Sequence, residues 1–210
     1  MVLKGAILPR EFYERDTLSV ARELLSCTLA VLKTPVTARQ ITKDGVAQVE
    51  QSLIAACGDI VECEAYLGLR DAAAHSYKTK PGGRVNIMYK SGGYAYIYLI
   101  YGIYNCLNAV TAGEGNPEAV LIRALQPLEG EDIRKYAGPG KLCREAGITR
   151  ADYGADLCAE ASSRIIILQR EGRRLPETKA TTRIGVEYSG EAAGYPYRFY
   201  DETSLSVSKK

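Results

Sequence analysis

The sequence predicts a single α/β or α+β domain, spanning residues 1–210 and built around a mixed sheet. Three observations lead to this prediction. Stretches with strand-like alternation, or with short buried apolar runs, outnumber helical stretches. The 210 residues are enough for one sizeable core and too few for two large domains. A hydrophobic content of 46% and a charged content of 25% are typical of ordinary globular proteins. We therefore expect one sheet with a few short helices packed against it.

The first third of the chain predicts one helix and two strands. "ERDTLSVARELLSC" is helical in pattern, and Asp16 is placed to cap its N-terminus. Its apolar residues at helical spacing are Leu18, Ala21, Leu24 and Leu25. "TLAVLK" follows as a short strand, and the polar residues 33–58 predict a loop or a long hairpin arm. "GDIVECEAYL" alternates as a strand, with one face made of Ile60, Glu62, Glu64 and Tyr66.

The remaining elements are separated by stretches that contain glycine and proline. "GLRDAAAHSYKTKPGGR" predicts a loop with a turn of helix around residues 72–74. Tyr94, Tyr96 and Tyr98 alternate as in a strand, and "EAVLIRALQPL" predicts another strand that ends at Pro127. "GPGKLCREAGI" predicts a helix, with proline near its start and Gly147 near its end. "SRIIILQR" predicts a buried strand.

Charge and hydropathy limit the location and the partners of the protein. No apolar run approaches the roughly 18 residues of a membrane span, and the first residues lack the pattern of a secretory signal. We therefore expect no membrane association and a place in the cytosol or with the DNA, in the nucleoid or nucleus. The net charge of +2 does not by itself indicate an anionic partner. The basic cluster in "REGRRLPETKATTR" predicts a solvated surface loop; its members are Arg170, Arg173, Arg174, Lys179 and Arg183.

The cysteines and the single histidine argue against a metal site. The six cysteines form no C-x-x-C pair, so a zinc site of the usual type is poorly supported. We expect reduced, buried thiols.

Two acidic residues are candidates for chemistry. Glu62 and Glu64 in "VECEAY" stand two apart on a strand and share a face. A carboxylate so placed could act as the general base that activates water, although this stretch taken alone favours a solvent-facing pair on an edge strand. His75 in "DAAAHS" follows eleven residues after Glu64 and could donate a hydrogen bond into the same site. A lone histidine is otherwise more often structural.

The tyrosine-rich stretch "GGYAYIYLIYGIYNCLN" raises a second possibility. Tyr96 and Tyr98 share a strand face, whereas Tyr101 falls where the strand should end and the chain should turn at Gly102. One ring could stack inside a pocket while the next projects beyond the strand. Planar faces with polar tips suit stacked nucleobases. A tyrosine-rich core with hydroxyls at its rim explains the pattern equally well.

These stretches together resemble the alkyladenine (3-methyladenine) DNA glycosylase family, also called the methylpurine DNA glycosylases. The resemblance runs in order from about residue 9 to residue 200 through "VECEAYLG", "AAAHS", "YAYIYLIYGIYNCLN", "VLIRALQPLEG", "GPGKLC" and "RIGVEYSGE…PYRFY". It implies a curved, largely antiparallel sheet flanked by short helices. It also implies a monomeric, monofunctional hydrolase of N-glycosyl bonds, without metal or cofactor, that flips alkylated or deaminated purines out of damaged double-stranded DNA.

The resemblance also implies roles for individual residues. Glu64 corresponds to the glutamate that activates water, and Arg123 to an arginine that holds the flipped nucleotide and the water. Tyr101 corresponds to the wedge that intercalates in the minor groove. The implied base pocket consists of Tyr66, His75, Tyr98 and Asn108, the last linked to rejection of guanine. Glu62 is then expected to be structural, bonded to backbone or to an arginine.

Three other functions fit parts of the pattern. A non-catalytic single-strand nucleic-acid binder would use the tyrosines without Glu64. A glycoside hydrolase would use Glu62 and Glu64, which strand geometry separates by about 6.5 to 7 Å. The absence of tryptophan argues against carbohydrate binding. A structural or interaction protein would leave the ordered set of motifs unexplained.

Overall fold

The computed structural model describes residues 2–128, 131–170, 172–173 and 175–210. The strands are β1 Val2–Ile7, β2 Thr28–Val36, β3 Thr42–Lys43, β4 Val46–Glu50, β5 Ile54–Tyr66, β6 Ala95–Ile100, β7 Tyr104–Thr111, β8 Glu118–Pro127, β9 Ser163–Gln169, β10 Thr178–Thr181 and β11 Arg198–Asp201. The α-helices are α1 Arg10–Tyr13, α2 Thr17–Leu24, α3 Ala38–Ile41 and α4 Pro139–Glu145. The 3₁₀ helices are η1 Gln51–Leu53, η2 Gly68–Arg70, η3 Gly83–Tyr89, η4 Arg150–Asp152 and η5 Glu187–Gly194.

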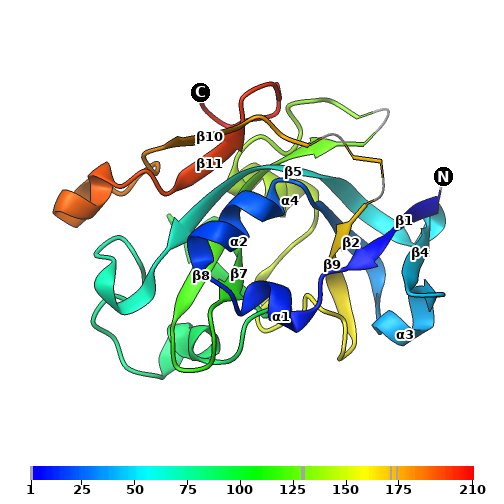
Figure 1. The fold of residues 1–210 in the computed structure, drawn as a ribbon, viewed down its shortest axis with the longest axis horizontal. Coiled ribbons are helices and arrows are strands. Elements are labelled where there is room, and N and C mark those ends of the chain that lie inside the picture. The colour runs from blue at the N-terminus through cyan, green and yellow to red at the C-terminus, as the bar shows by residue number, and fades with distance from the viewer. Residues whose placement is uncertain (1, 129–130, 171, 174) are drawn as a thin grey trace.

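In the described part of the chain, eleven strands form one sheet around the long strand β5. Their order is β3-β4-β1-β9-β2-β5-β8-β7-β6, with β11 added to β5 and β10 added to β11. Figure 1 shows β1 and β4 at one end of this sheet and β7 and β8 toward the other. Each strand ladder among these residues is antiparallel. The antiparallel sheet implied by the resemblance is confirmed, and the mixed sheet expected from the residue pattern is not.

Two helices cover the central strands. α2 packs on β5 and β8, and α4 packs on β7 and β8. Asp16 caps α2, since its carboxylate accepts a hydrogen bond from the Ser19 amide at 2.8 Å, as predicted. Leu24 at the end of this helix is fully buried in the largest apolar cluster of the described residues. Among the residues that the structure describes, no helix is long and apolar enough to cross a membrane.

Several local predictions are confirmed. The "GPGKLCREAGI" helix is α4, which has proline at its first turn, and "SRIIILQ" is β9, a central strand. β6 ends at Ile100 and the chain turns at Tyr101 and Gly102. The six cysteines are free and buried.

Two local predictions are wrong. For residues 33–58 the loop is wrong, because they contain the end of β2, α3, β3, β4, η1 and the start of β5, whereas the alternative of a hairpin arm agrees with the antiparallel pair of β3 and β4. Their polar residues face water on a short meander at the sheet edge, where strands can be solvated on one side. The single turn of helix lies at Gly68–Arg70 rather than at residues 72–74, which form a turn held by the Asp71 side chain.

The expected single face of β5 is interrupted by irregular pairing with β8. The register shifts between Ile60 and Glu62, and again between Glu62 and Cys63. Ile60 consequently joins Cys63 in the main core, instead of sharing the face of Glu64. Arg123 of β8 is the residue skipped at the second shift. Bulges of this kind re-aim side chains, and here Arg123 is directed at both Glu62 and Glu64.

Three arginines of the basic cluster are paired with carboxylates inside the fold, so the prediction of a solvated loop is wrong for them. Arg170 and Arg173 both contact the Asp59 carboxylate, at 2.8 and 3.4 Å. Arg183 is buried in an ion pair with Asp71. Lys179 alone matches the expectation of an exposed charge, with Glu202 2.6 Å away. Arg174 lies outside the described residues.

The Asp16 cap provides a test of this fold at low risk to the site. Asp16→Ala should lower the free energy of unfolding by about 1 kcal/mol, because the Ser19 amide loses its acceptor. Urea denaturation measures the change. Asp16→Asn, which keeps an acceptor oxygen, should remain close to the parent, and an equal loss in both variants would contradict the role of the cap.

Candidate active site

A cavity of about 760 Å³ opens between β6, β7, α4 and the segment 184–188. It is the larger of the two described cavities by almost tenfold in volume. Its lining includes six residues on which the site depends: Tyr66, His75, Tyr96, Tyr98, Asn108 and Arg123. The size and the mixture of rings with a few polar groups are typical of a small-molecule or base pocket.

Glu64 lies behind this lining and is fully buried. Its Oε1 accepts a hydrogen bond from the Ile184 amide at 2.8 Å. Its Oε2 accepts one from the Tyr66 hydroxyl at 2.8 Å and lies 3.3 Å from Nη1 of Arg123. All three partners line the cavity. The carboxylate therefore adjoins the cavity through its partners, rather than forming part of its exposed wall.

Arg123 connects the two acidic residues of β5. Its Nε donates to Oε1 of Glu62 at 3.2 Å, while its Nη1 faces Glu64. Burial alone would lower the pKa of Arg123, but the charges of Glu64 and Glu62 outweigh burial and raise this pKa above its ordinary value. Both glutamates are fully buried, so the solvent-facing pair that the stretch alone favoured is wrong. The expected bond between Glu62 and an arginine is confirmed.

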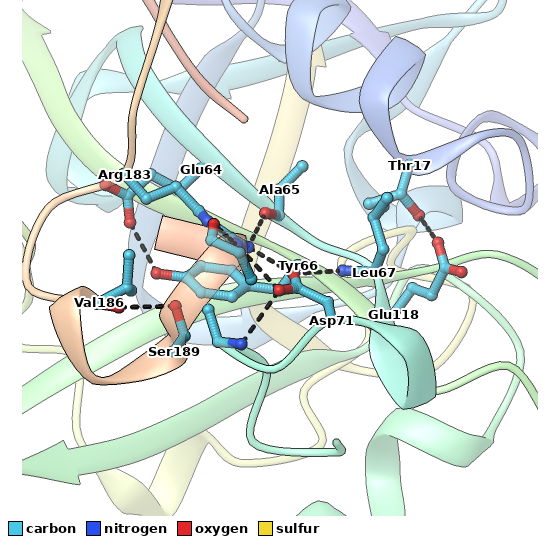
Figure 2. Close-up of polar contacts among 12 residues, drawn as sticks. Thr17, Glu64, Ala65, Tyr66, Leu67, Asp71, Glu118, Arg183, Val186 and Ser189 are labelled. Atoms are coloured by element: carbon cyan, nitrogen blue, oxygen red, sulfur yellow. Dashed lines mark hydrogen bonds and ion pairs between the residues drawn. The ribbon is translucent and has the colours of Figure 1, made fainter. Parts of the chain in front are cut away.

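A second buried arginine organises the other side of Tyr66. Figure 2 shows Glu64, Tyr66, Asp71 and Arg183 gathered in one network of polar contacts. Arg183 pairs with Asp71, donates to the carbonyl of Ala65, and lies 4.7 Å from the centroid of the Tyr66 ring. Because residue 184 follows directly, this pair fixes the amide that binds Glu64. Burial, followed by the charge of Glu64, raises the pKa of Tyr66 well above its ordinary value.

Three rings form the opposite wall. His75 and Tyr98 meet edge to face, with centroids 4.4 Å apart, and Tyr96 lies 5.6 Å from Tyr98 at a tilt of 31°. Nδ1 of His75 is 2.9 Å from the Tyr96 hydroxyl. Burial, assisted by Arg84, lowers the pKa of His75 from its ordinary value of 6.5 to about 4. The imidazole is therefore neutral near pH 7 and can present its Nε2 as a donor or as an acceptor.

The Asn108 side chain is held by the backbone of the β6–β7 hairpin. Its Nδ2 donates to the carbonyl of Tyr96 at 3.0 Å, and the residue is only 3% exposed. The amide nitrogen is thus occupied by the protein, while the residue still lines the cavity. The side chain is therefore held in one orientation.

The turn between β6 and β7 presents a strained, exposed aromatic ring. Tyr101 is 84% exposed and has a φ of 53°, and Gly102 follows with a φ of 73°. The Ile103 amide closes the turn on the carbonyl of Ile100 at 3.2 Å. Left-handed backbone costs a tyrosine about 1 kcal/mol or more. The tight hairpin turn requires positive φ at its central residues, and it leaves the Tyr101 ring projecting into solvent.

The structure thus brings most of the predicted site residues together. Tyr66, His75, Tyr98, Asn108, Arg123 and Tyr101 all line the one cavity, and Glu64 contacts two of them. Their chemical roles stay predictions. The contributions of Arg183, the Ile184 amide and the hydroxyl of Tyr96 were not predicted from the sequence. No local pattern marks these groups, because their partners lie between 21 and 120 residues away.

Comparison with known proteins identifies the family of the chain. The model of the methylpurine-DNA glycosylase (MPG) family matches residues 11–205, which include all of the cavity lining. The chain belongs to the methylpurine-DNA glycosylase family.

Similar proteins cover nearly the whole length of this family member. A protein of Methanocella arvoryzae is 44% identical, with 97% of this chain and 96% of that protein covered. A protein of Bdellovibrio bacteriovorus is 41% identical, with 97% of this chain and 100% of that protein covered. A protein of Clostridium novyi is 40% identical, with 97% of this chain and 98% of that protein covered. All three carry the name 3-methyladenine DNA glycosylase, qualified in each case as a provisional assignment.

Among the described residues, no group of three or more His, Cys, Asp or Glu side chains is placed to hold a metal ion. The donors around Glu64 are a hydroxyl, a backbone amide and a guanidinium, and each of them donates a proton rather than a lone pair.

The neutral His75 generates a prediction about acid stability. The unfolded chain protonates His75 near pH 6.5 and the folded chain near pH 4, so the unfolded state binds more protons between these values. Stability should therefore fall as the pH drops through this window. His75→Asn should reduce the slope of unfolding free energy against pH, measured by urea denaturation at several pH values. Identical slopes for the two proteins would contradict the buried neutral imidazole.

Proposed function

We propose that the protein is a DNA glycosylase that flips alkylated or deaminated purines out of duplex DNA and hydrolyses their N-glycosidic bond. The observation that carries this proposal is the position of Glu64, whose carboxylate touches Tyr66 and Arg123 at the wall of a ring-lined cavity. Family membership and the names of the relatives support the same class of reaction.

Extrusion of the base is assigned to the β6–β7 turn. A base inside a duplex is inaccessible to side chains, and unstacking it costs a few kcal/mol. Tyr101 projects from the tip of the hairpin with 84% of its surface exposed, next to Ile103 with 68%. Its ring can fill the gap that the extruded base leaves and so offset part of this cost. The basic residues Arg84, Lys141 and Arg144 border the same cavity and are suited to the DNA phosphates.

Recognition of the base is assigned to the rings and to Asn108. An alkylated purine that carries a positive charge stacks favourably on the faces of tyrosines such as Tyr66 and Tyr98. His75 stays uncharged beside them, because of its low pKa, and therefore does not repel such a base. Its free ring nitrogen can hydrogen-bond the edge of the base. Damaged bases also unpair more easily than normal ones, which adds to selectivity.

The chemical step uses one carboxylate and one water molecule. The water oxygen attacks C1′ of the deoxyribose, the bond between C1′ and the purine nitrogen breaks, and its electron pair leaves with the base. A cationic alkylated purine leaves as a neutral base, whereas an uncharged purine leaves as an anion and takes up a proton from the solvent. Glu64 takes the proton of the water and steadies the positive charge that develops on the sugar. The products are a free base and an abasic site in an intact strand, so no lyase step is involved.

Access of water to Glu64 requires a small local movement. Oε2 already has two donors, whereas Oε1 has the Ile184 amide alone and retains a lone pair. A water on Oε1 would sit beside the segment 184–186, which lines the cavity. Since Glu64 is fully covered in the free protein, we expect the Tyr66 hydroxyl or this segment to shift when a nucleotide enters.

The alternatives are less well supported. A glycoside hydrolase needs a second free carboxylate, but Glu62 accepts hydrogen bonds from two arginines and from Ser208. A non-catalytic nucleic-acid binder leaves the buried pair of Glu64 and Arg123 without a purpose at the pocket. A purely structural protein leaves the cavity and the strained Tyr101 unexplained.

Replacement of Glu64 tests the chemical step. Glu64→Gln should lower base release from duplexes with hypoxanthine or 7-methylguanine by at least about 10²-fold, because it removes the general base. Single-turnover assays with alkaline cleavage of the abasic product measure the rate, and gel shifts measure binding, which should stay near the parent value. Glu50→Gln, at an exposed position on β4, is the matched control. Near-normal release by Glu64→Gln would reject the assignment.

Replacement of Tyr101 tests the wedge. Tyr101→Asn removes the ring while retaining a residue that tolerates left-handed backbone, so the turn should be at least as stable as before. We expect weaker flipping, seen as a smaller rise of 2-aminopurine fluorescence next to the lesion, and faster dissociation from DNA. Tyr101→Phe should behave like the parent. Undiminished flipping in the Asn variant would exclude Tyr101 as the wedge.

A further inference from the structure

Glu62 is the centre of a second buried polar cluster, on the side of Arg123 away from the cavity. Its Oε1 accepts from Nε of Arg123 at 3.2 Å, from Nε of Arg198 at 2.6 Å and from the Ser208 hydroxyl at 2.9 Å. Its Oε2 accepts from the Ser208 amide at 2.7 Å. Glu62 is fully buried, and both arginines are less than a tenth exposed.

The charges of this cluster balance those of the site. Glu62 and Glu64 supply two negative charges, and Arg123 and Arg198 supply two positive ones. A buried ion pair is stable only when its geometry is good and its remaining lone pairs are satisfied. Removal of one donor loses part of the hydrogen bonding that offsets burial of the Glu62 carboxylate, and the remaining donors readjust around it. Arg123, which lies between the two carboxylates, is the group that such a shift would move.

Residues 204–210 carry the donors that complete the cluster. Beside the two bonds from Ser208, the carbonyl of Lys209 accepts a bond from Arg198. The segment is held elsewhere by Arg134, whose Nη1 donates to the carbonyls of Leu205 and Val207 at 2.9 Å each. Ser206 donates to the carbonyl of Ile133 at 2.6 Å. The segment 204–210 therefore places Ser208 against Glu62, and the contacts that hold this segment do not involve the cavity.

We propose that Ser208 is a positioning residue, which fixes Glu62 so that Arg123 is aimed at Glu64 and at the reacting nucleotide. The proposal rests on the glycosylase function and adds to it a segment that does not reach the cavity, since residues 204–210 are absent from its lining. The path is short: Ser208 to Glu62, Glu62 to Arg123, and Arg123 to Glu64. Because the reacting groups must stay close to one geometry, a small rotation of Arg123 slows the reaction without preventing DNA binding.

A graded series at position 208 tests the proposal. Ser208→Thr keeps both donors and should act like the parent. Ser208→Ala loses the hydroxyl and should slow single-turnover excision about tenfold, the equivalent of one hydrogen bond to a charged group. Ser208→Pro also loses the amide and should slow excision further. Binding of lesion duplex, measured by gel shift, should be unchanged, so that the loss appears in the rate at saturating enzyme.

Ser206→Ala is the matched control. It removes a buried serine hydroxyl from the same segment, but that hydroxyl reaches Ile133 and not Glu62. Urea denaturation shows whether the two alanine variants lose similar stability. A selective loss of excision in Ser208→Ala supports positioning. Excision at the parent rate in both the Ala and the Pro variant, or an equal loss in Ser206→Ala, would overturn it.

A readout without catalysis separates this proposal from the function on which it rests. The Nε–H resonance of Arg123 in a ¹⁵N–¹H spectrum, assigned with Arg123→Lys, should move in Ser208→Ala and stay in place in Ser206→Ala. An unmoved resonance overturns the positioning path whatever the activity. If the parent protein releases no base from any lesion duplex while the resonance does move, the proposed function fails and the path from Ser208 to Arg123 stands.

Discussion

Two carboxylates buried side by side on the central strand are the constraint on which the rest of the site depends. Glu62 and Glu64 leave water completely, which costs several kcal/mol for each ion unless cations and hydrogen bonds replace the solvent. Arg123 from β8 meets both, and Arg198 from β11 meets Glu62. The paired register shifts between β5 and β8 are the means by which a strand residue reaches two neighbouring carboxylates at once.

The need to replace solvent is met differently at the two glutamates, which therefore have different roles. Glu62 is saturated by donors from three parts of the chain and holds position, whereas Glu64 keeps a lone pair and adjoins the cavity through partners that can move. Other parts of the site also differ in how firmly they are held. The pair of Arg183 and Asp71 fixes one wall, while Tyr101 adopts unfavourable backbone at the exposed tip of a hairpin.

The electrostatic character of the cavity follows from these pairings. In its interior the charge of Arg123 is balanced by the glutamates, and His75 is neutral because burial lowers its pKa to about 4. At its mouth, Arg84, Lys141 and Arg144 are exposed. Under the proposed function, the nearly neutral, ring-lined interior suits either a cationic or an uncharged purine, and the basic rim suits the phosphates on either side.

The sequence by itself determined what depends on near neighbours: the Asp16 cap, the helix after Pro139, the tyrosine face of β6 and the turn at Gly102. It also determined the family, because the motifs occur together and in order. Only the tertiary structure decided that Arg183 is buried, that Ile60 leaves the face of Glu64, and that Ser208 meets Glu62. Caps, turns and alternation are set by the local backbone geometry. Burial, bulges and ion pairs are set by partners more than a hundred residues away or on another strand, and one sequence read alone carries no spacing signal for them.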